Sequence, residues 1–254
     1  MKNRLSRRKF ITTSLATVAG ASGIAVAARI ADRYGLIPPD HGGIYGIGET
    51  LTYASQRLLM SYHSQAREFD QSQISETPIV NGNPPQNETY ERLLDGRFAD
   101  WRLTIDGLVA RPSSFSLADL KSYPSRTQTT QLACEEGWSF IAEWTGVPLS
   151  YVLNLVGVLP QAKYAVYLSL DKEWWDSIDM PEAWHPQTLL TYGMNGSDLT
   201  VGHGAPLRLR LPRQLGYRSL KYVHHITVTD NLKNFGNGLG SSALDDGYSW
   251  YAGI

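Results

Sequence analysis

The chain contains a single cysteine, Cys134, so no intrachain disulfide can hold its fold together. Its stability must come from a buried core, and 42% of the 254 residues are hydrophobic, which is enough for one large domain. The 14 tyrosines and 7 tryptophans favour a β-rich fold over a helical bundle. A formal charge of -1 lacks the strongly basic balance that is typical of a nucleic-acid-binding protein.

Apolar residues alternate over several short segments, which predicts strands. The expected strands are 101–109, 127–133, 164–170, 207–211 and 222–229. Helices are expected at 49–63, 117–123 and 148–157, the second behind a Ser116–Asp119 capping box. The polar stretch 64–100 is expected to be irregular. Because strands and short helices mix without βαβ regularity, the sequence predicts an α+β fold with mixed, mostly antiparallel sheets.

The N-terminus resembles an export signal. Two adjacent arginines, Arg7 and Arg8, precede an uncharged run from Phe10 to Ala28, which matches the twin-arginine type of secretory signal. The run is too weakly hydrophobic for a typical transmembrane helix. We therefore expect a periplasmic or exported protein, either cleaved or tethered to the membrane by an uncleaved signal, and divide the chain into a signal segment (1–28), a linker with a helix (29–61) and a catalytic domain (62–254).

Cys134 stands where the expected strand 127–133 ends and the chain turns through Gly137. A thiol at a strand end is placed at the edge of a sheet, where ligands and reactive groups tend to lie. An unpaired cysteine in an exported protein is an inert buried residue, a reactive thiol or a metal ligand. Its thiolate would select soft or high-valent metals over magnesium or calcium.

The segment 203–221 concentrates basic residues in a chain of otherwise balanced charge. Arg208 and Arg210 lie two apart on an expected strand, so both point to one face. The turn from Gly216 to Ser219 offers backbone N–H groups beside Arg218 and Lys221, and such groups together bind phosphate esters. An ordinary solvated strand face explains the pattern equally well.

The order and spacing of six motifs resemble the sulfite-oxidase-type molybdopterin-binding oxidoreductases, near the exported methionine-sulfoxide reductase catalytic subunits. The motifs are 105–109, 134–138, 144–149, 185–189, 192–196 and 203–221. The resemblance covers the chain from Tyr62 onward. It implies a sulfite-oxidase-like fold with short peripheral helices, and a cofactor of molybdenum bound by molybdopterin.

The resemblance also assigns residues. Cys134 would supply the protein thiolate to molybdenum and act as the catalytic residue. The residues that would hold the pterin and its phosphate are Arg67, Glu68, Ser169, His203, Arg208, Ser219, Leu220 and Lys221. His185 and Asn195 are further candidate contacts. Molybdenum chemistry moves an oxygen atom with two electrons, while the protein positions substrate and tunes the metal.

Two departures from sulfite oxidases bear on the substrate. The tyrosine beside the metal in those enzymes corresponds to Trp174 here, and Cys134 is followed by Glu-Glu-Gly-Trp without a nearby arginine. A sulfoxide or related oxide is therefore the expected substrate of a reductase, with oxidation of a small sulfur compound as the alternative. No second, dimer-forming domain is expected, so the catalytic subunit is expected to be monomeric.

The electron partner is expected to be a haem protein or a membrane subunit, since the chain carries no haem or flavin motif. Two competing functions stay open from the residues alone. A cofactor-free thiol enzyme would need a base that lowers the pKa of Cys134, and a non-catalytic module would only retain the fold. Glu135 and Glu136 are either proton shuttles or, more commonly, exposed loop carboxylates. His224 and His225 are expected to point to opposite faces of a strand, one buried and one solvated.

Overall fold

A computed structural model describes residues 26, 29–31, 35–41, 43, 46–59, 64–171 and 174–254. The expected export signal, apart from Val26, lies outside these described residues. None of the helices in the described part of the chain is long and apolar enough to cross a membrane.

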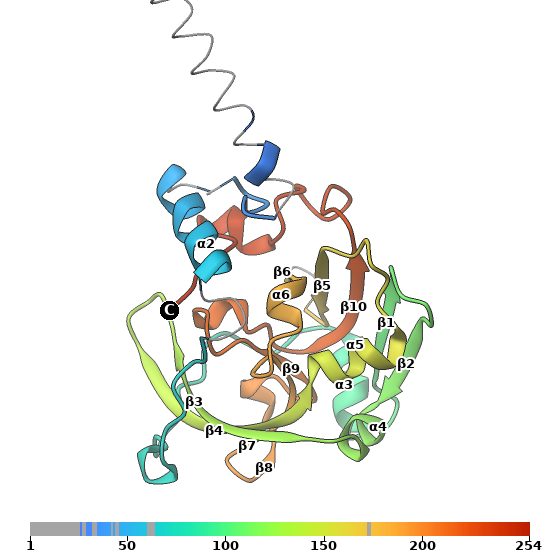
Figure 1. Cartoon of the computed structure of the whole chain (residues 1–254). Helices are drawn as coiled ribbons and strands as arrows, with labels where there is room; N and C mark the ends of the chain where they lie inside the picture. Colours follow the sequence, from blue (N-terminus) through green and yellow to red (C-terminus); the bar gives the residue numbers. More distant parts are fainter. Residues whose placement is uncertain are drawn as a thin grey trace, which may run out of the picture.

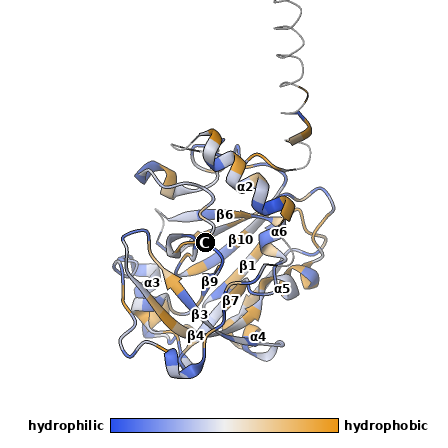
Figure 2. Ribbon diagram, turned by 60° about the vertical axis from the view of Figure 1, so that its left-hand side comes forward, coloured by the Kyte–Doolittle hydropathy of each residue, from blue (hydrophilic) through white to orange (hydrophobic). Residues whose placement is uncertain are grey.

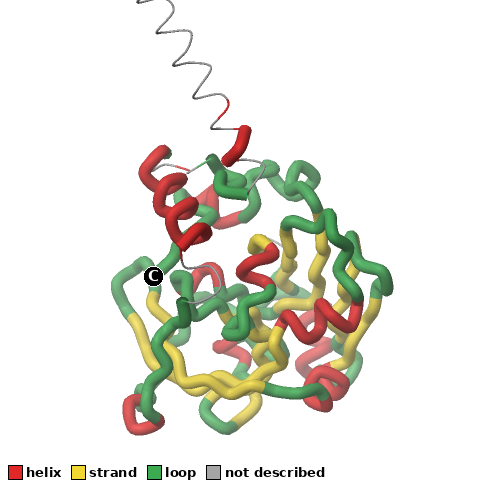
Figure 3. The backbone as a smooth tube through the Cα atoms, viewed as in Figure 1, coloured by secondary structure: helices red, strands yellow, loops and turns green. Residues whose placement is uncertain are grey.

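The first of two sheets is five-stranded and mixed (Figures 1 and 3). Its strands, in spatial order, are β2 (Ser113–Ser116), β1 (Arg102–Gly107), β10 (Val223–Thr229), β5 (Tyr164–Ser169) and β6 (Trp175–Asp179). β1 and β10 are parallel, and the other neighbouring pairs are antiparallel. The chain reaches β10 last, so the N-terminal and C-terminal parts of the domain meet in the middle of this sheet.

The second sheet is antiparallel and curves beneath the first (Figure 1). It runs β3 (Arg126–Ala133), β4 (Ser139–Pro148), β7 (Leu189–Met194) and β8 (Ser197–Asp198), with β9 (Arg208–Arg210) paired to β7. All pairings within it are antiparallel. The expected mixed, mostly antiparallel α+β fold is confirmed.

One apolar cluster joins the two sheets. It takes Leu103 and Ile105 from β1, Ile226 from β10 and Leu190 from β7, each at most 1% exposed. The helix α5 (Leu149–Val156) adds its buried face to this cluster. Figure 2 shows apolar residues along the strands and mainly hydrophilic residues along the outer loops. Both sheets are therefore fixed to one core, and the loops at their ends have fixed positions.

The helices are short and peripheral. They are α2 (Ile47–Leu59), α3 (Glu88–Asp95), α4 (Leu117–Ser122), α5 and α6 (Met180–Ala183), with 3-10 turns at Gln71–Gln73, Val201–His203, Gly216–Arg218 and Ser242–Asp246. The capping box expected before α4 is present, because Ser116 and Asp119 exchange hydrogen bonds. Of the helix expected at 49–63, residues 60–63 lie outside the described part of the chain.

Several elements were not expected from the sequence, among them β2, β6, β8 and α6. The stretch 64–100 contains α3, which begins where the Asn87 side chain accepts a hydrogen bond from the Tyr90 N–H at 3.0 Å. β4 and β7 were not expected, and all six residues of β7 are buried. A strand buried on both faces shows no alternation of polarity, so periodicity does not reveal it.

Candidate functional site

Cys134 directly follows β3, at the entrance to a tight turn. Its N–H donates to the Trp138 carbonyl at 2.9 Å, and the Gly137 N–H donates to the Cys134 carbonyl at 3.1 Å. Gly137 adopts a φ of 92°, a left-handed conformation that favours glycine. This turn places Cys134 in the wall of a cavity of about 940 Å³.

The cavity brings together seven of the nine residues that the sequence resemblance assigned. Besides Cys134, the lining includes Ser169, His203, Arg208, Ser219, Leu220 and Lys221. Ser169 lies in β5, Arg208 in β9 and His203 in the 3-10 turn before β9. Cys134 directly follows β3, and residues 219–221 directly follow the 3-10 turn Gly216–Arg218. Gly216 allows the second of these turns to approach the Cys134 strand closely, because a Cβ there would lie 2.8 Å from Leu132 Cδ2.

The structure does not place the other candidate contacts in this lining. The Arg67 guanidinium lies 4.7 Å from the Phe69 ring centroid, and Glu68 forms an ion pair with Arg126 at 2.5 Å. His185 lies within 3.2 Å of the Ser64 carbonyl, and Asn195 accepts a hydrogen bond from the Glu143 N–H at 2.9 Å.

Among the described residues, three cations beside the cavity have only neutral hydrogen-bond partners. Arg208 is 4% exposed and donates to the His203 and Ser219 carbonyls at 3.1 and 2.8 Å. Arg210 is fully buried and donates to the Gln131 carbonyl and to Ser219 Oγ. Lys221 donates to the carbonyls of Asn81 and Gly202 at 2.6 and 3.0 Å.

No carboxylate of the described residues forms an ion pair with these three cations. The Nε atoms of Arg208 and Arg210 are buried, and no hydrogen-bond partner for them exists in the described part of the chain. Both guanidinium groups lie close to the Trp144 ring, 5.2 and 5.1 Å from its centroid. We name Arg208, Arg210 and Lys221 the cation cluster.

Burial without a counter-charge lowers the pKa values in this cluster. It lowers the pKa of Arg208 to about 10 and that of Arg210 to about 9. Burial, with Arg208 nearby, lowers the pKa of Lys221 to about 8. The pKa of His203 falls to about 4 through burial and the charges of Arg208 and Lys221. These shifts show that no carboxylate of the described residues compensates the charge of the cation cluster.

A phosphorylated organic cofactor would supply the negative charge that the cation cluster lacks. Buried cations are costly unless an anion pairs with them, and arginine forks are suited to phosphate oxygens. Neighbouring buried arginines show the contrast, because Arg213 pairs with Glu182 at 2.7 Å and Arg218 pairs with Asp176. The chain thus neutralises these buried arginines with carboxylates, whereas Arg208 and Lys221 line the cavity and are available to an external anion.

The expected contribution of Arg218 and of the backbone N–H groups at 218 and 219 to a phosphate site is wrong. The N–H groups of Arg218 and Ser219 are bonded within the turn, to the Leu215 and Gly216 carbonyls at 3.1 and 2.9 Å. The Arg218 side chain is 1% exposed and does not line the cavity. The alternative left open by the sequence, a solvated strand face, is excluded for β9, because all three of its residues are buried.

The mouth of the cavity is acidic and aromatic near Cys134. Glu135 and Glu136 are exposed, with carboxylate oxygens 3.4 and 3.9 Å from Cys134 Sγ. Burial, reinforced by Glu135, raises the pKa of the Cys134 thiol to about 11. A nucleophilic cysteine needs the opposite environment. Trp174 is 40% exposed and lines the same cavity.

Several lining residues were not anticipated from the sequence. The loop 79–87 forms one wall, and its Asn-Gly-Asn-Pro-Pro run at 81–85 marked only a turn. Tyr217 and Tyr248 form another part of the wall and stack with ring centroids 4.9 Å apart. His224 and His225 are both partly buried rather than split between core and solvent, and His225 contacts Asp106 at 2.9 Å.

The model of the family described as oxidoreductase molybdopterin binding domain matches residues 91–235. The chain is 39% identical over 155 residues to the putative protein-methionine-sulfoxide reductase subunit YedZ1 of Azospira oryzae, covering 61% of this chain and 56% of the relative. It is 32% identical over 145 residues to the protein-methionine-sulfoxide reductase catalytic subunit MsrP of Ralstonia nicotianae, covering 51% and 44%.

A structural neighbour is the sulfane dehydrogenase SoxCD from Paracoccus pantotrophus, with a TM-score of 0.49, 29% identity, and coverage of 52% of this chain and 39% of that chain. The matched region spans about half the length of the curated relatives. The family model, by contrast, matches more than half of this chain. The chain therefore belongs to the oxidoreductase molybdopterin-binding domain family.

Proposed function

We propose that this protein is an exported molybdenum oxidoreductase that removes an oxygen atom from a sulfoxide-type substrate. The observation that carries the proposal is the shared cavity. It has one soft metal ligand, Cys134, in one wall and two members of the cation cluster, Arg208 and Lys221, in another. A metal bound through sulfur and an anionic organic carrier need these two features together.

Different residues of the cavity would bind different parts of the cofactor. Cys134 would bind molybdenum through its thiolate, which a coordinated metal ion keeps deprotonated. Arg208 and Lys221 would neutralise the phosphate of the pterin. Ser169 and Ser219, at 4% and 2% exposure, would fix its polar edges by hydrogen bonds. The bound group would supply two-electron oxygen-atom transfer.

The net reaction would convert a sulfoxide, two electrons and two protons into a sulfide and water. The sulfur–oxygen bond breaks, sulfur is reduced, and the oxygen leaves as water. The electrons would come from a haem-containing or membrane-bound electron-transfer partner. Glu135 and Glu136 are the carboxylates of the cavity mouth closest to Cys134, so they are the candidate proton carriers.

The substrate proposal draws on the relatives and on the cavity mouth. Two of the similar proteins are named as protein-methionine-sulfoxide reductase components. Trp174 lines the mouth with an apolar surface, which suits a thioether-like substrate better than the sulfite dianion. Sulfite oxidation is the competing outcome. Export rests on the sequence of residues 6–28 and is tested separately, by fractionation of the producing cell.

The test is metal and cofactor analysis of protein matured in a host that makes molybdopterin. We expect about one molybdenum atom and one pterin per chain, together with reoxidation of a reduced dye by sulfoxides. If the protein instead reduces the dye with sulfite, sulfite oxidation replaces sulfoxide reduction as the proposed reaction. Folded protein that contains neither molybdenum nor extractable pterin would overturn the whole function.

A further inference from the structure

The helix α2 is attached to the domain through its polar side. Ser249 Oγ donates to the Glu49 carboxylate at 2.7 Å, and the Tyr53 hydroxyl donates to Asp179 at 2.7 Å. Glu49 and Tyr53 are the buried residues of the helix. The Tyr251 hydroxyl donates to Gln56 on the same side. Polar contacts, rather than apolar packing alone, therefore set the orientation of α2.

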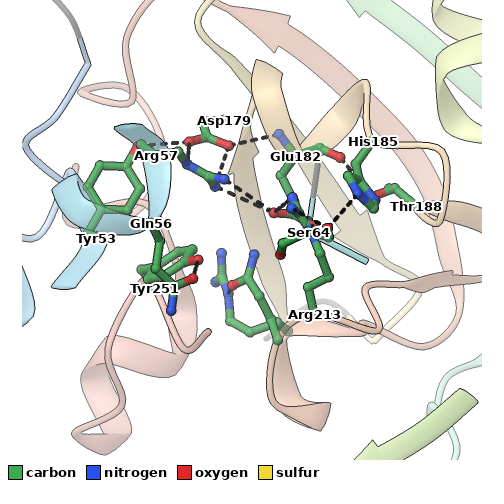
Figure 4. A network of polar contacts seen from close by, with 12 residues as sticks. Tyr53, Gln56, Arg57, Ser64, Asp179, Glu182, His185, Thr188, Arg213 and Tyr251 are labelled. Carbon is green, nitrogen blue, oxygen red and sulfur yellow. Dashed lines mark hydrogen bonds and ion pairs between the residues drawn. The ribbon is translucent and has the colours of Figure 1, made fainter. Parts of the chain in front are cut away.

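A buried ion-pair network fixes that orientation (Figure 4). Arg57 contacts Asp179 at 2.6 Å and Glu182 at 3.5 Å. Glu182 is 1% exposed and also binds Arg213 at 2.7 Å. Turning α2 over would leave these carboxylates buried without Arg57, which is strongly unfavourable. The outward face of α2 is therefore a permanent feature of the surface.

That outward face is apolar. Ile47, Leu51, Leu58 and Leu59 are 79%, 61%, 67% and 78% exposed. At 100° per residue, Ile47, Leu51 and Leu58 fall on one stripe of the helix. The other exposed residues of α2 are Gly48, Thr52 and Ser55, so the face carries no charge. An ordinary surface helix has the reverse arrangement, with its apolar stripe buried.

We propose that this stripe, Ile47, Leu51 and Leu58 with the adjoining Leu59, lies on the lipid surface of a membrane. A charge-free apolar face can enter the interface between headgroups and acyl chains without desolvating an ion. Only residues 29–46 separate α2 from the uncharged run Phe10–Ala28, a span of at most about 60 Å when extended. Association of that run with a bilayer would keep α2 within reach of the same bilayer.

A second copy of the chain is a poorer occupant. A stable dimer buries about 800 Å² on each partner, and one face of a 13-residue helix offers only a few side chains. Because the stripe carries no charge, binding should depend on apolar area and should be insensitive to salt and to anionic lipid. Basic interfacial helices behave differently, because they need anionic headgroups.

Docking by α2 would bring the Cys134 cavity close to the membrane. Gly48, Glu49 and Thr52 line a second cavity of about 560 Å³. The lining of this second cavity also includes Glu135, Tyr217 and Tyr248, which line the Cys134 cavity as well. Contact of α2 with lipid does not depend on which cofactor or substrate the Cys134 cavity takes.

The test is carbene footprinting of the full chain, with a water-soluble diazirine, before and after addition of neutral phosphatidylcholine vesicles. Labelling of Ile47, Leu51 and Leu58 should fall at least about fivefold on vesicles, because exposed side chains become buried. Labelling of Leu94 and Leu239, which are 38% and 37% exposed on other elements, should not change. Because labelling is measured at individual residues, burial of α2 can be distinguished from membrane binding by residues 1–28.

Variants give an independent measurement. Leu51→Ser with Leu58→Ser should weaken partitioning of the full chain onto neutral vesicles by about tenfold or more, while Leu94→Ser with Leu239→Ser should not. Unchanged labelling of α2 on vesicle-bound protein would overturn the proposal. Protection that rises with protein concentration without lipid would assign a second copy instead. Protection of α2 by native membranes but not by pure lipid would show that a membrane protein covers the stripe. Either of these last two results would contradict binding to a lipid surface.

Discussion

Replacement of Arg208 by leucine tests the cation cluster directly. The side chain is 4% exposed and makes two hydrogen bonds, both to backbone carbonyls. Leucine removes those bonds, but it also removes a buried charge that has no carboxylate partner among the described residues. We expect these effects to offset one another, with the free energy of unfolding of cofactor-free protein changing by no more than about 1.5 kcal/mol.

The loaded protein should respond differently. Loss of a charge-assisted contact to a phosphate group costs about 2–4 kcal/mol, which corresponds to about 30- to 1,000-fold weaker binding. Pterin and molybdenum content after dialysis should fall accordingly. Arg208→Lys, which keeps the charge but loses the fork, should retain an intermediate content.

Arg218→Leu is the matched control, because Arg218 is equally buried but pairs with Asp176. Its removal leaves an unpaired buried carboxylate and should cost about 3–5 kcal/mol of stability. Urea denaturation of the cofactor-free proteins measures both values. Full cofactor content in Arg208→Leu, or a stability loss as large as that of Arg218→Leu, would refute the reasoning.

Three further predictions follow from the site and its surroundings. Cys134→Ser should lose molybdenum and turnover while keeping its circular dichroism spectrum, and a fully active variant would refute Cys134 as the ligand. Trp174→Tyr should raise KM for an apolar sulfoxide without a loss of molybdenum content, so an unchanged KM would exclude Trp174 from substrate contact. Burial lowers the pKa of His185 to about 4, and its Nδ1 accepts the Gln187 N–H at 3.2 Å. Because the pKa of His185 is lower in the folded protein than in the unfolded chain, its contribution to the free energy of unfolding is complete above about pH 6.5 and is lost as the pH falls toward 4. The loss amounts to about 2 kcal/mol at pH 5. His185→Gln should flatten the stability curve between these pH values in urea titrations, and an unchanged slope would contradict the assignment.

Much of the local structure was readable from short-range patterns. Alternation predicted β3 and β10, and the Ser116–Asp119 pair predicted the start of α4, because both features depend on neighbouring residues alone. The position of Cys134 at a strand end followed from the same alternation and a glycine turn. β7 was missed because its six residues are all buried, and α3 was missed because the polar stretch around it masked its cap.

The amino-acid sequence by itself determined the single thiol, the strand that ends in it, and the placement of Arg208 and Arg210 on one face of β9. It left open whether that face was solvated or buried. Only the tertiary structure decided this, by placing Trp144 of β4 against both guanidinium groups and by giving their charges no carboxylate among the described residues. The outward apolar side of α2 was also undetermined by its sequence, since a helical period shows that one face is apolar but not which face is buried. The physical reason is the same in both cases. Periodicity along the chain is a local property, whereas burial and charge compensation depend on segments that are distant in sequence.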